Sequence, residues 1–239
     1  MIKFIDQFIE EFPIKDELNN NFSNLDRNPL NQNECCYVFD FTQNKIIFQK
    51  GFDQFLGYSD EEIDLNFIID KYHSEDRAVV INIIKAVIYQ FKESPFQSFT
   101  NFLNMSYRFR RSDGTYVKIL SKCWTYTTND KNQISSVLIK YSDISFIDHT
   151  NIVKWSVDPN YIDKERISNE IYGNYLKLFT SRELEVIIEV FKGILSKKIA
   201  ETLNISEYTV ATHRKNIFKK SNCHNREELL EFCMKNGIV

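Results

Sequence analysis

The sequence of 239 residues contains little glycine, little proline and few cysteines. Its six glycines never occur at the spacings G-x-G-x-x-G or G-x-x-x-x-G-K-[ST], so the two common phosphate-binding loops are absent. No apolar run approaches the roughly 20 residues that span a bilayer. Asp6, Glu10 and Glu11 interrupt the apolar start of the chain, so we expect neither a signal peptide nor a membrane partner.

The five cysteines are an odd number and include no C-x-x-C pair. Structural zinc sites are commonly built from such pairs, so we expect no bound metal. Without secretory context, the cysteines are expected to be reduced thiols in the cytoplasm. The four histidines have no cysteine, serine or carboxylate partner at a spacing typical of a triad or zinc site, so we predict no catalytic residues.

The net charge of −3 divides unevenly along the chain. Residues 178–239 hold ten Lys/Arg against eight Asp/Glu, a net charge of +2. The remaining residues hold 20 Lys/Arg against 25 Asp/Glu, a net charge of −5. A basic surplus is the usual electrostatic mark of a nucleic-acid partner. The surplus here is small, so charge alone only leaves DNA binding open for the C-terminal quarter.

Residues 2–12 place apolar side chains at spacings of three and four, which predicts an amphipathic helix. This helix packs either on its own domain or against a second subunit. Pro13 and the Asn-rich stretch 16–33 indicate a loop. Residues 1–33 are therefore expected to form an N-terminal helix and loop.

Residues 34–148 combine strand and helix patterns. The expected elements are two strands, one long helix and three further strands, at 35–41, 45–49, 74–92, 105–111, 115–127 and 134–144. Ser112-Asp113-Gly114 is typical of a hairpin turn. Because the last three strands follow one another directly, the pattern predicts an α+β domain with a five-stranded antiparallel sheet and helices.

Four short motifs occur in this region: FLGYSDEEI (55–63), His73-Ser-Glu-Asp76, RRSDGTY (110–116) and Asp143-Ile144-Ser145. In this order they resemble the sensor domains of the PAS family, over about 34–148. The resemblance implies a domain that responds to a small-molecule or protein signal, with a PAS ligand that stays unknown. No cofactor is required: the flavin motif N-C-R-F is absent, and His73 is expected to be structural instead of a haem ligand. The interior either holds a ligand or is filled by the domain's own aromatic side chains.

Residues 149–177 have a lower apolar density, and we expect them to be a connector. From 178 to 239 the pattern predicts an all-α domain of four helices. Capping residues mark the expected helix starts: Thr180 with Glu183 as a capping box, then Ser196, Ser206 and Asn225. The second and third helices, joined by a tight turn, predict a helix-turn-helix motif at about 196–215.

This segment carries a dense set of motif residues: Thr180-Ser-Arg-Glu183-x-Glu185-Val186, Lys197-x-Ile199-Ala200, Ile205-Ser206-x-x-Thr209-Val210, His213, Asn216-Ile217, Lys220 and Asn225-Arg226-Glu227. With these residues it resembles the DNA-binding domain of the LuxR family, also called GerE or NarL type. Ser221 departs from the leucine usual in the family and is expected to loosen the end of the third helix. The resemblance implies a transcription regulator that binds double-stranded DNA as a homodimer.

At 100° per residue, Val210 and Ile217 define the buried stripe of the third helix, and small, polar and basic residues lie opposite. The residues predicted to contact bases, where the resemblance also places groove-facing positions, are Ala211, Thr212 and Lys215. The residues predicted to contact phosphates are Lys197, Ser206, Thr209, Lys219 and Lys220. His213, at the edge of the buried stripe, is expected to pack.

Two other functions stay open. A response regulator would need a receiver domain within 1–148, with an acidic pair after the first strand, a phosphoacceptor Asp and a Lys on a parallel sheet. Asp40 stands alone at that place. Alternatively, the PAS domain docks a kinase or another sensor, and DNA binding is secondary.

Overall fold

The computed structural model describes residues 25, 27, 29–90, 101–236 and 238. The helix expected at 2–12 lies outside these residues. The chain divides into two compact units on either side of the bond between Lys164 and Glu165. Each unit is described by itself.

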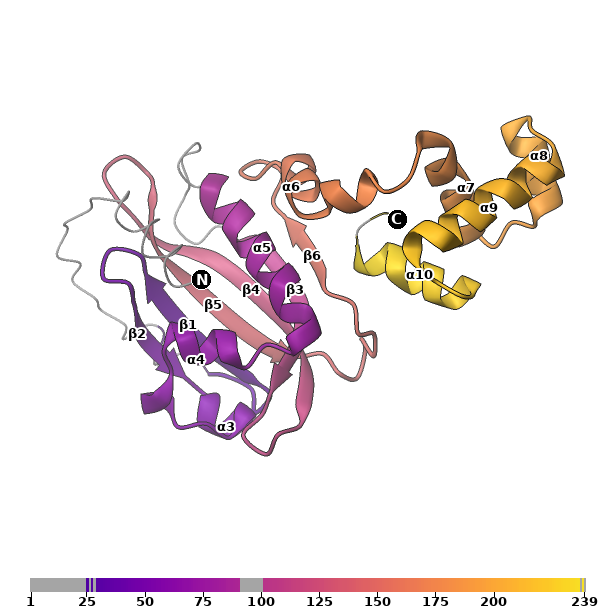
Figure 1. Ribbon diagram of the computed structural model, residues 1–239. Helices are drawn as coiled ribbons and strands as arrows, with labels where there is room; N and C mark the ends of the chain where they lie inside the picture. Colours follow the sequence, from indigo (N-terminus) through magenta and orange to yellow (C-terminus); the bar gives the residue numbers. More distant parts are fainter. Residues whose placement is uncertain (1–24, 26, 28, 91–100, 237, 239) are drawn as a thin grey trace. The chain divides into compact units, whose positions relative to one another are not determined.

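The first unit is a sheet in which every strand pair of the described residues is antiparallel, in the spatial order β2-β1-β5-β4-β3-β6 (Figure 1). The strands are β1 (Glu34–Asp40), β2 (Lys45–Lys50), β3 (Asn101–Arg110), β4 (Tyr116–Thr128), β5 (Ile134–Asp143) and β6 (Lys154–Val157). Between β2 and β3 the chain forms α3 (Phe52–Leu56), a 3-10 turn (Asp60–Glu62), α4 (Leu65–Asp70) and α5 (Ser74–Gln90). Helices α4 and α5 cover one face of the sheet.

The turn between β1 and β2 depends on Asp40 and Asn44. The Asp40 carboxylate accepts hydrogen bonds from the backbone N–H of Thr42 at 2.7 Å and of Gln43 at 3.0 Å. Asn44 adopts the left-handed conformation with φ 51°, which asparagine tolerates better than most residues. Asp40 is therefore a turn-forming residue. The antiparallel sheet contradicts the receiver-domain alternative, which requires parallel strands.

The start of α5 is attached to β3 by the carboxylate of Asp76, which is 2% exposed. Its Oδ2 accepts from the Arg108 backbone N–H at 2.8 Å and from Arg108 Nε at 3.1 Å, and its Oδ1 lies 2.5 Å from Arg108 Nη2. Asp76 also lies in the first turn of α5, where a negative charge favours the helix dipole. One side chain thus fixes both the helix start and its distance from the sheet.

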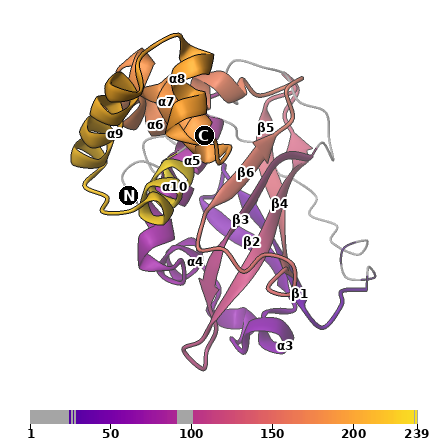
Figure 2. The same cartoon turned by 90° about the vertical axis from the view of Figure 1, so that its right-hand side faces the viewer.

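The sixth strand is a correction to the expected five-stranded sheet, whose antiparallel pairing and helices are confirmed. β6 lies within the expected connector 149–177 and pairs with β3 from Leu103↔Val157 to Ser106↔Lys154 (Figure 2). Its four residues are too few to show a period-two pattern, so sequence periodicity could not find it. Lys118 Nζ also donates to the Ile152 carbonyl oxygen at 2.6 Å, which ties the chain just before β6 to the sheet.

The second unit contains helices α6 (Lys164–Leu176), α7 (Ser181–Phe191), α8 (Ser196–Leu203), α9 (Glu207–Ser221) and α10 (Arg226–Lys235). Helices α7 to α10 confirm the expected four-helix domain. Their shared core consists of Phe179, Val186, Ile187, Val190, Ile199, Ala200, Val210, Ile217, Leu229 and Cys233.

Three of the four expected caps are confirmed. The capping box of Thr180 and Glu183 is formed, and Ser206 and Asn225 accept from Thr209 N and Glu228 N. Ser196 is not a cap: Leu195 holds that position without a side-chain bond. At Ser221 the helix α9 ends, and the Ser221 hydroxyl donates to the Ile217 carbonyl at 2.9 Å, so the expected loosening of this helix end stays a prediction.

We expect Asp76→Ala to destabilise the first unit by about 3 kcal/mol, because Arg108 would lose its buried counter-ion. Urea unfolding followed by tryptophan fluorescence measures this unit alone, since both tryptophans, Trp124 and Trp155, belong to it. The matched control is Asp70→Ala, which removes a carboxylate that is 58% exposed and should cost less than about 1 kcal/mol. Equal losses in the two variants would contradict a structural role for the buried pair.

Candidate nucleic-acid interface

Helices α8 and α9 are joined by a short turn that two local interactions define. Asn204 ends α8 in the left-handed conformation, with φ 51° and ψ 48°. Two residues later, the Ser206 hydroxyl accepts from Thr209 N at 3.0 Å and begins α9. The turn has no room for additional residues, so α9 follows α8 at a fixed angle, as in a helix-turn-helix motif.

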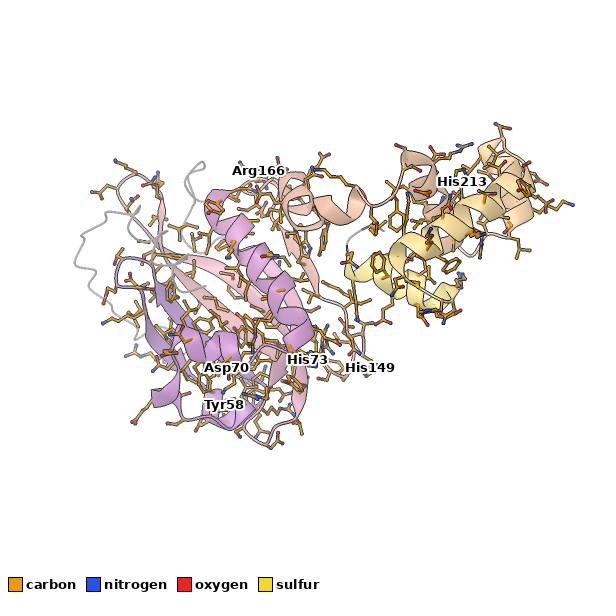
Figure 3. All side chains as sticks on the ribbon, in the orientation of Figure 1. Tyr58, Asp70, His73, His149, Arg166 and His213 are labelled. Carbon is orange, nitrogen blue, oxygen red and sulfur yellow. The ribbon has the colours of Figure 1, made fainter. Side chains whose placement is uncertain are left out.

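The buried side of α9 decides which of its residues face solvent. Val210 and Ile217 are 0% and 1% exposed and belong to the core of the domain, as predicted. His213, labelled on α9 in Figure 3, is half-buried at the edge of this stripe. The opposite face is free of core contacts.

The three residues predicted to contact bases lie together on this solvent face. Ala211, Thr212 and Lys215 are all exposed. The Thr212 hydroxyl donates to the Tyr208 carbonyl at 3.0 Å, and the Tyr208 side chain is 84% exposed. An exposed tyrosine in the first turns of this helix was not among the predicted contacts. The helical wheel places it opposite Val210, and that was the signal that could have identified it.

The positive charges of this domain differ in whether a carboxylate neutralises them. Five of the ten Lys/Arg side chains in 178–239 form ion pairs: Arg182, Lys192, Lys198, Lys220 and Lys235. Arg226 donates to the Val190 carbonyl. Within the part of the chain that the structure describes, the other four, which have neither an ion pair nor a hydrogen bond to a carbonyl, are Lys197, Arg214, Lys215 and Lys219.

All four of these cations lie on α8 or α9. The acidic residue of α9, Glu207, lies at its N-terminal end. Apart from Arg226 on α10, the positive charge of this domain that no carboxylate neutralises therefore lies on the two helices of the helix-turn-helix motif. Such a surface is suited to a polyanion with regularly spaced charges.

The predicted phosphate contacts fall into two groups. Lys197 and Lys219 are exposed, and Ser206 and Thr209 lie at the N-terminus of α9, where the Ser206 hydroxyl is 2.8 Å from Thr209 Oγ1. Lys220 differs, because its Nζ lies 2.6 Å from Glu183 Oε2. Lys220 therefore forms an ion pair inside the domain, and its phosphate contact stays a prediction.

Glu183 connects the start of α7 to the end of α9. Its Oε2 accepts from Lys220 Nζ and, at 2.7 Å, from the Thr180 backbone N–H. Burial alone would raise the pKa of Glu183, but these hydrogen bonds outweigh it and leave the pKa below its ordinary value. The carboxylate is thus ionised in the folded domain and holds α9 in place from its C-terminal end.

The comparison with known families agrees with this architecture. Residues 177–233 match the family described as "Bacterial regulatory proteins, luxR family", and residues 45–138 match the family described as "PAS fold". Fold and site together define a PAS domain followed by a helix-turn-helix domain. The C-terminal domain of this chain belongs to the LuxR family of bacterial regulatory proteins.

Two curated relatives are similar to part of this chain. The transcriptional regulatory protein YxjL of Bacillus subtilis is 44% identical over 61 residues, which cover 26% of this chain and 28% of that protein. The oxygen regulatory protein NreC of Staphylococcus epidermidis is 29% identical over 113 residues, which cover 46% of this chain and 50% of that protein. The chain thus spans half or less of the length of these relatives.

Among solved structures, the complex of phage VqmA with DPO is 14% identical, with a TM-score of 0.32, and covers 99% of this chain and 91% of that one.

Among the described residues, no helix is both long and apolar enough to cross a membrane.

The Glu183–Lys220 pair makes the second unit sensitive to acid. Because the pKa of Glu183 is lower in the folded domain than its ordinary 4.5, the stabilisation is complete above pH 4.5 and is lost as the pH falls through the folded value. We expect amide protection in α7 and α9, corrected for intrinsic exchange, to decrease below pH 4.5. Glu183→Gln should cost about 1–2 kcal/mol at pH 7 and flatten this dependence. The control Glu201→Gln, at an exposed pair, should keep the parent's acid response.

Proposed function

We propose that this chain is a transcription regulator that binds double-stranded operator DNA as a homodimer and responds to a small-molecule or protein signal at its PAS domain. The observation that carries the proposal is the exposed face of α8 and α9, where Lys197, Lys215 and Lys219 have no carboxylate partner among the described residues. We assign it no catalytic reaction. It acts in the cytoplasm, in keeping with its five free cysteines.

In the proposed complex, α9 enters the major groove and its exposed face meets the base edges. Lys215 reaches guanine acceptors, and Thr212 and Ala211 contact neighbouring base edges. Lys197 and Lys219 contact phosphates on either side of the groove. The N-terminus of α9, with Ser206 and Thr209, offers backbone N–H groups to a further phosphate.

Substitutions on this face should separate base contacts from phosphate contacts. Lys215→Ala should reduce the preference for specific over random duplex by roughly 1–3 kcal/mol. Lys219→Ala should instead weaken binding to every duplex and lower the salt slope by about one unit, as for one lost phosphate contact. The measurement is a titration of both duplexes at several salt concentrations.

Two variants control this series. Lys235→Ala removes a cation that is paired with Glu231 on α10, so it should change neither preference nor salt slope. Val210→Asp places a charge in the core and should lower thermal stability, unlike the surface variants. If Lys215→Ala and Thr212→Ala bind every duplex as the parent does, α9 does not read the sequence.

Homodimer binding predicts a strict requirement on operator spacing. Two copies related by a two-fold axis contact half-sites about one helical turn apart, on one face of the duplex. Inserting five base pairs between half-sites should abolish joint binding, and inserting about ten should restore it. Electrophoretic mobility of the complexes distinguishes one bound copy from two. Equal affinity for all spacings would contradict the dimeric mode.

The protein-interaction alternative stays a prediction. Phe146 and Ile147 follow β5 and are 75% and 68% exposed, so they offer an apolar contact for a signalling partner of the PAS domain. A pull-down with and without operator DNA separates the alternatives: a partner captured without DNA, together with no specific duplex binding, would favour docking as the main function.

A further inference from the structure

A cavity of about 110 Å³ lies within the PAS domain, between the inner face of the sheet and helices α4 and α5. The domain's own aromatic side chains therefore do not fill the interior completely. The residues that line the cavity are mostly apolar. An engineered apolar cavity of roughly 150 Å³ in another protein binds benzene, so the space here suits a molecule built on a single small ring.

The register of the sheet gives this cavity a polar end and an apolar end. Ser121 of β4 pairs with Tyr141 of β5, and two residues further along β4, Cys123 pairs with Ile139. The next inward pair is Thr125 with Val137. Side chains on one face of a strand recur every second residue. Hydroxyl groups therefore line one end of the cavity, and the aliphatic side chains Ile139 and Val137 line the other.

Four tyrosines gather at the polar end: Tyr37, Tyr72, Tyr107 and Tyr141, each 5% exposed or less. The hydroxyls of Tyr37 and Tyr141 lie 3.3 Å apart. Tyr72, Tyr107 and Ser121 also line the cavity and add their hydroxyls to this cluster. Burial raises the pKa of Tyr72 to about 12, so the phenols are neutral.

The hydrogen bonds of this cluster leave acceptor capacity unused. Each hydroxyl has one donor and two acceptor sites. Together the five hydroxyls of Tyr37, Tyr72, Tyr107, Tyr141 and Ser121 have five donors and ten acceptor sites, so hydrogen bonds within the cluster can occupy at most five of these acceptor sites. A molecule in the cavity would therefore find acceptors at the polar end.

The charge of the lining selects against ions. Among the described residues that line the cavity, the charged side chain is Lys85, half-buried on α5. The tyrosine end holds neutral groups only. A charged group buried there would lose its hydration without gaining a counter-ion.

We propose that this cavity binds a small uncharged molecule whose single ring packs on the apolar end and whose O–H or N–H group donates to the hydroxyl cluster formed by Tyr37, Tyr72, Tyr107, Tyr141 and Ser121. The inference rests on the proposed function of the PAS domain as a sensor and names the chemical class of its signal.

Three probes of similar size test this class on the full-length chain: phenol, benzene and benzoate. Titration followed by the NMR shifts of the PAS domain should give phenol about tenfold tighter binding than benzene, because one additional hydrogen bond is formed. Benzoate should not bind. Benzoate binding as tight as phenol, or equal binding of phenol and benzene, would overturn the proposal.

Matched variants identify the groups that recognise the probe. Tyr107→Phe keeps the ring and should weaken phenol binding about tenfold while leaving benzene unchanged. The control Tyr116→Phe removes a hydroxyl outside the cavity, on a side chain that is 45% exposed, and should change neither. Cys123→Phe should fill the cavity and abolish binding of both probes. Unchanged phenol binding in Cys123→Phe would place the probe elsewhere and overturn the assignment.

Thermal melts accompany each titration, and Ser121→Ala gives a second, smaller change at the same cluster in case Tyr107→Phe fails to fold. DNA affinity is measured on the same preparations. If the probes fail to bind while the chain binds DNA, the ligand class is wrong and the DNA-binding function stands. If the probes bind but the chain does not bind DNA, the ligand class stands and the DNA-binding function is wrong.

Discussion

Glu183 accepts hydrogen bonds from the Thr180 backbone N–H and from Lys220 Nζ, and so connects the first turn of α7 with the last turn of α9. The buried stripe of Val210 and Ile217 fixes the rotation of α9 about its own axis, but apolar contacts allow sliding. The ion pair fixes the remaining freedom, because a hydrogen bond is directional. The exposed cations of α9 therefore keep a defined position relative to α8. The proposed contact with the DNA major groove requires such a fixed position, because the groove has a constant width.

Sheet register has the same role in the first unit. A shift of one residue between β4 and β5 would turn Ser121 and Cys123 to the outer face. The cavity would then lose both its hydroxyl end and its width. The Asp76–Arg108 pair holds α5 at its distance from β3, so the space above the strands is kept open by a charged contact at its margin.

Local signals could be predicted from the sequence, and distant partners could not. The caps at Thr180, Ser206 and Asn225 act within three residues, so the sequence contains all that is needed. The helical wheel likewise identified the exposed face of α9. The ion pair of Lys220 could not be predicted, because its partner lies 37 residues away on another helix. The four tyrosines of the cavity come from separate segments: the sheet register brings Tyr37, Tyr107 and Tyr141 together, and Tyr72, between α4 and α5, is held beside β3 by its bridge to Phe109.

The two edge strands of the sheet, β2 and β6, have a consequence for self-association. An open edge presents unpaired backbone groups that can extend the sheet into a second molecule. Here β6 has four residues and begins with Lys154, whose side chain is 53% exposed, and β2 begins with the exposed Lys45. Short strands and lysines at sheet edges discourage such extension, since a second strand would have to bury their charge. Copies of this chain at high local concentration are therefore disfavoured from joining into a continuous sheet.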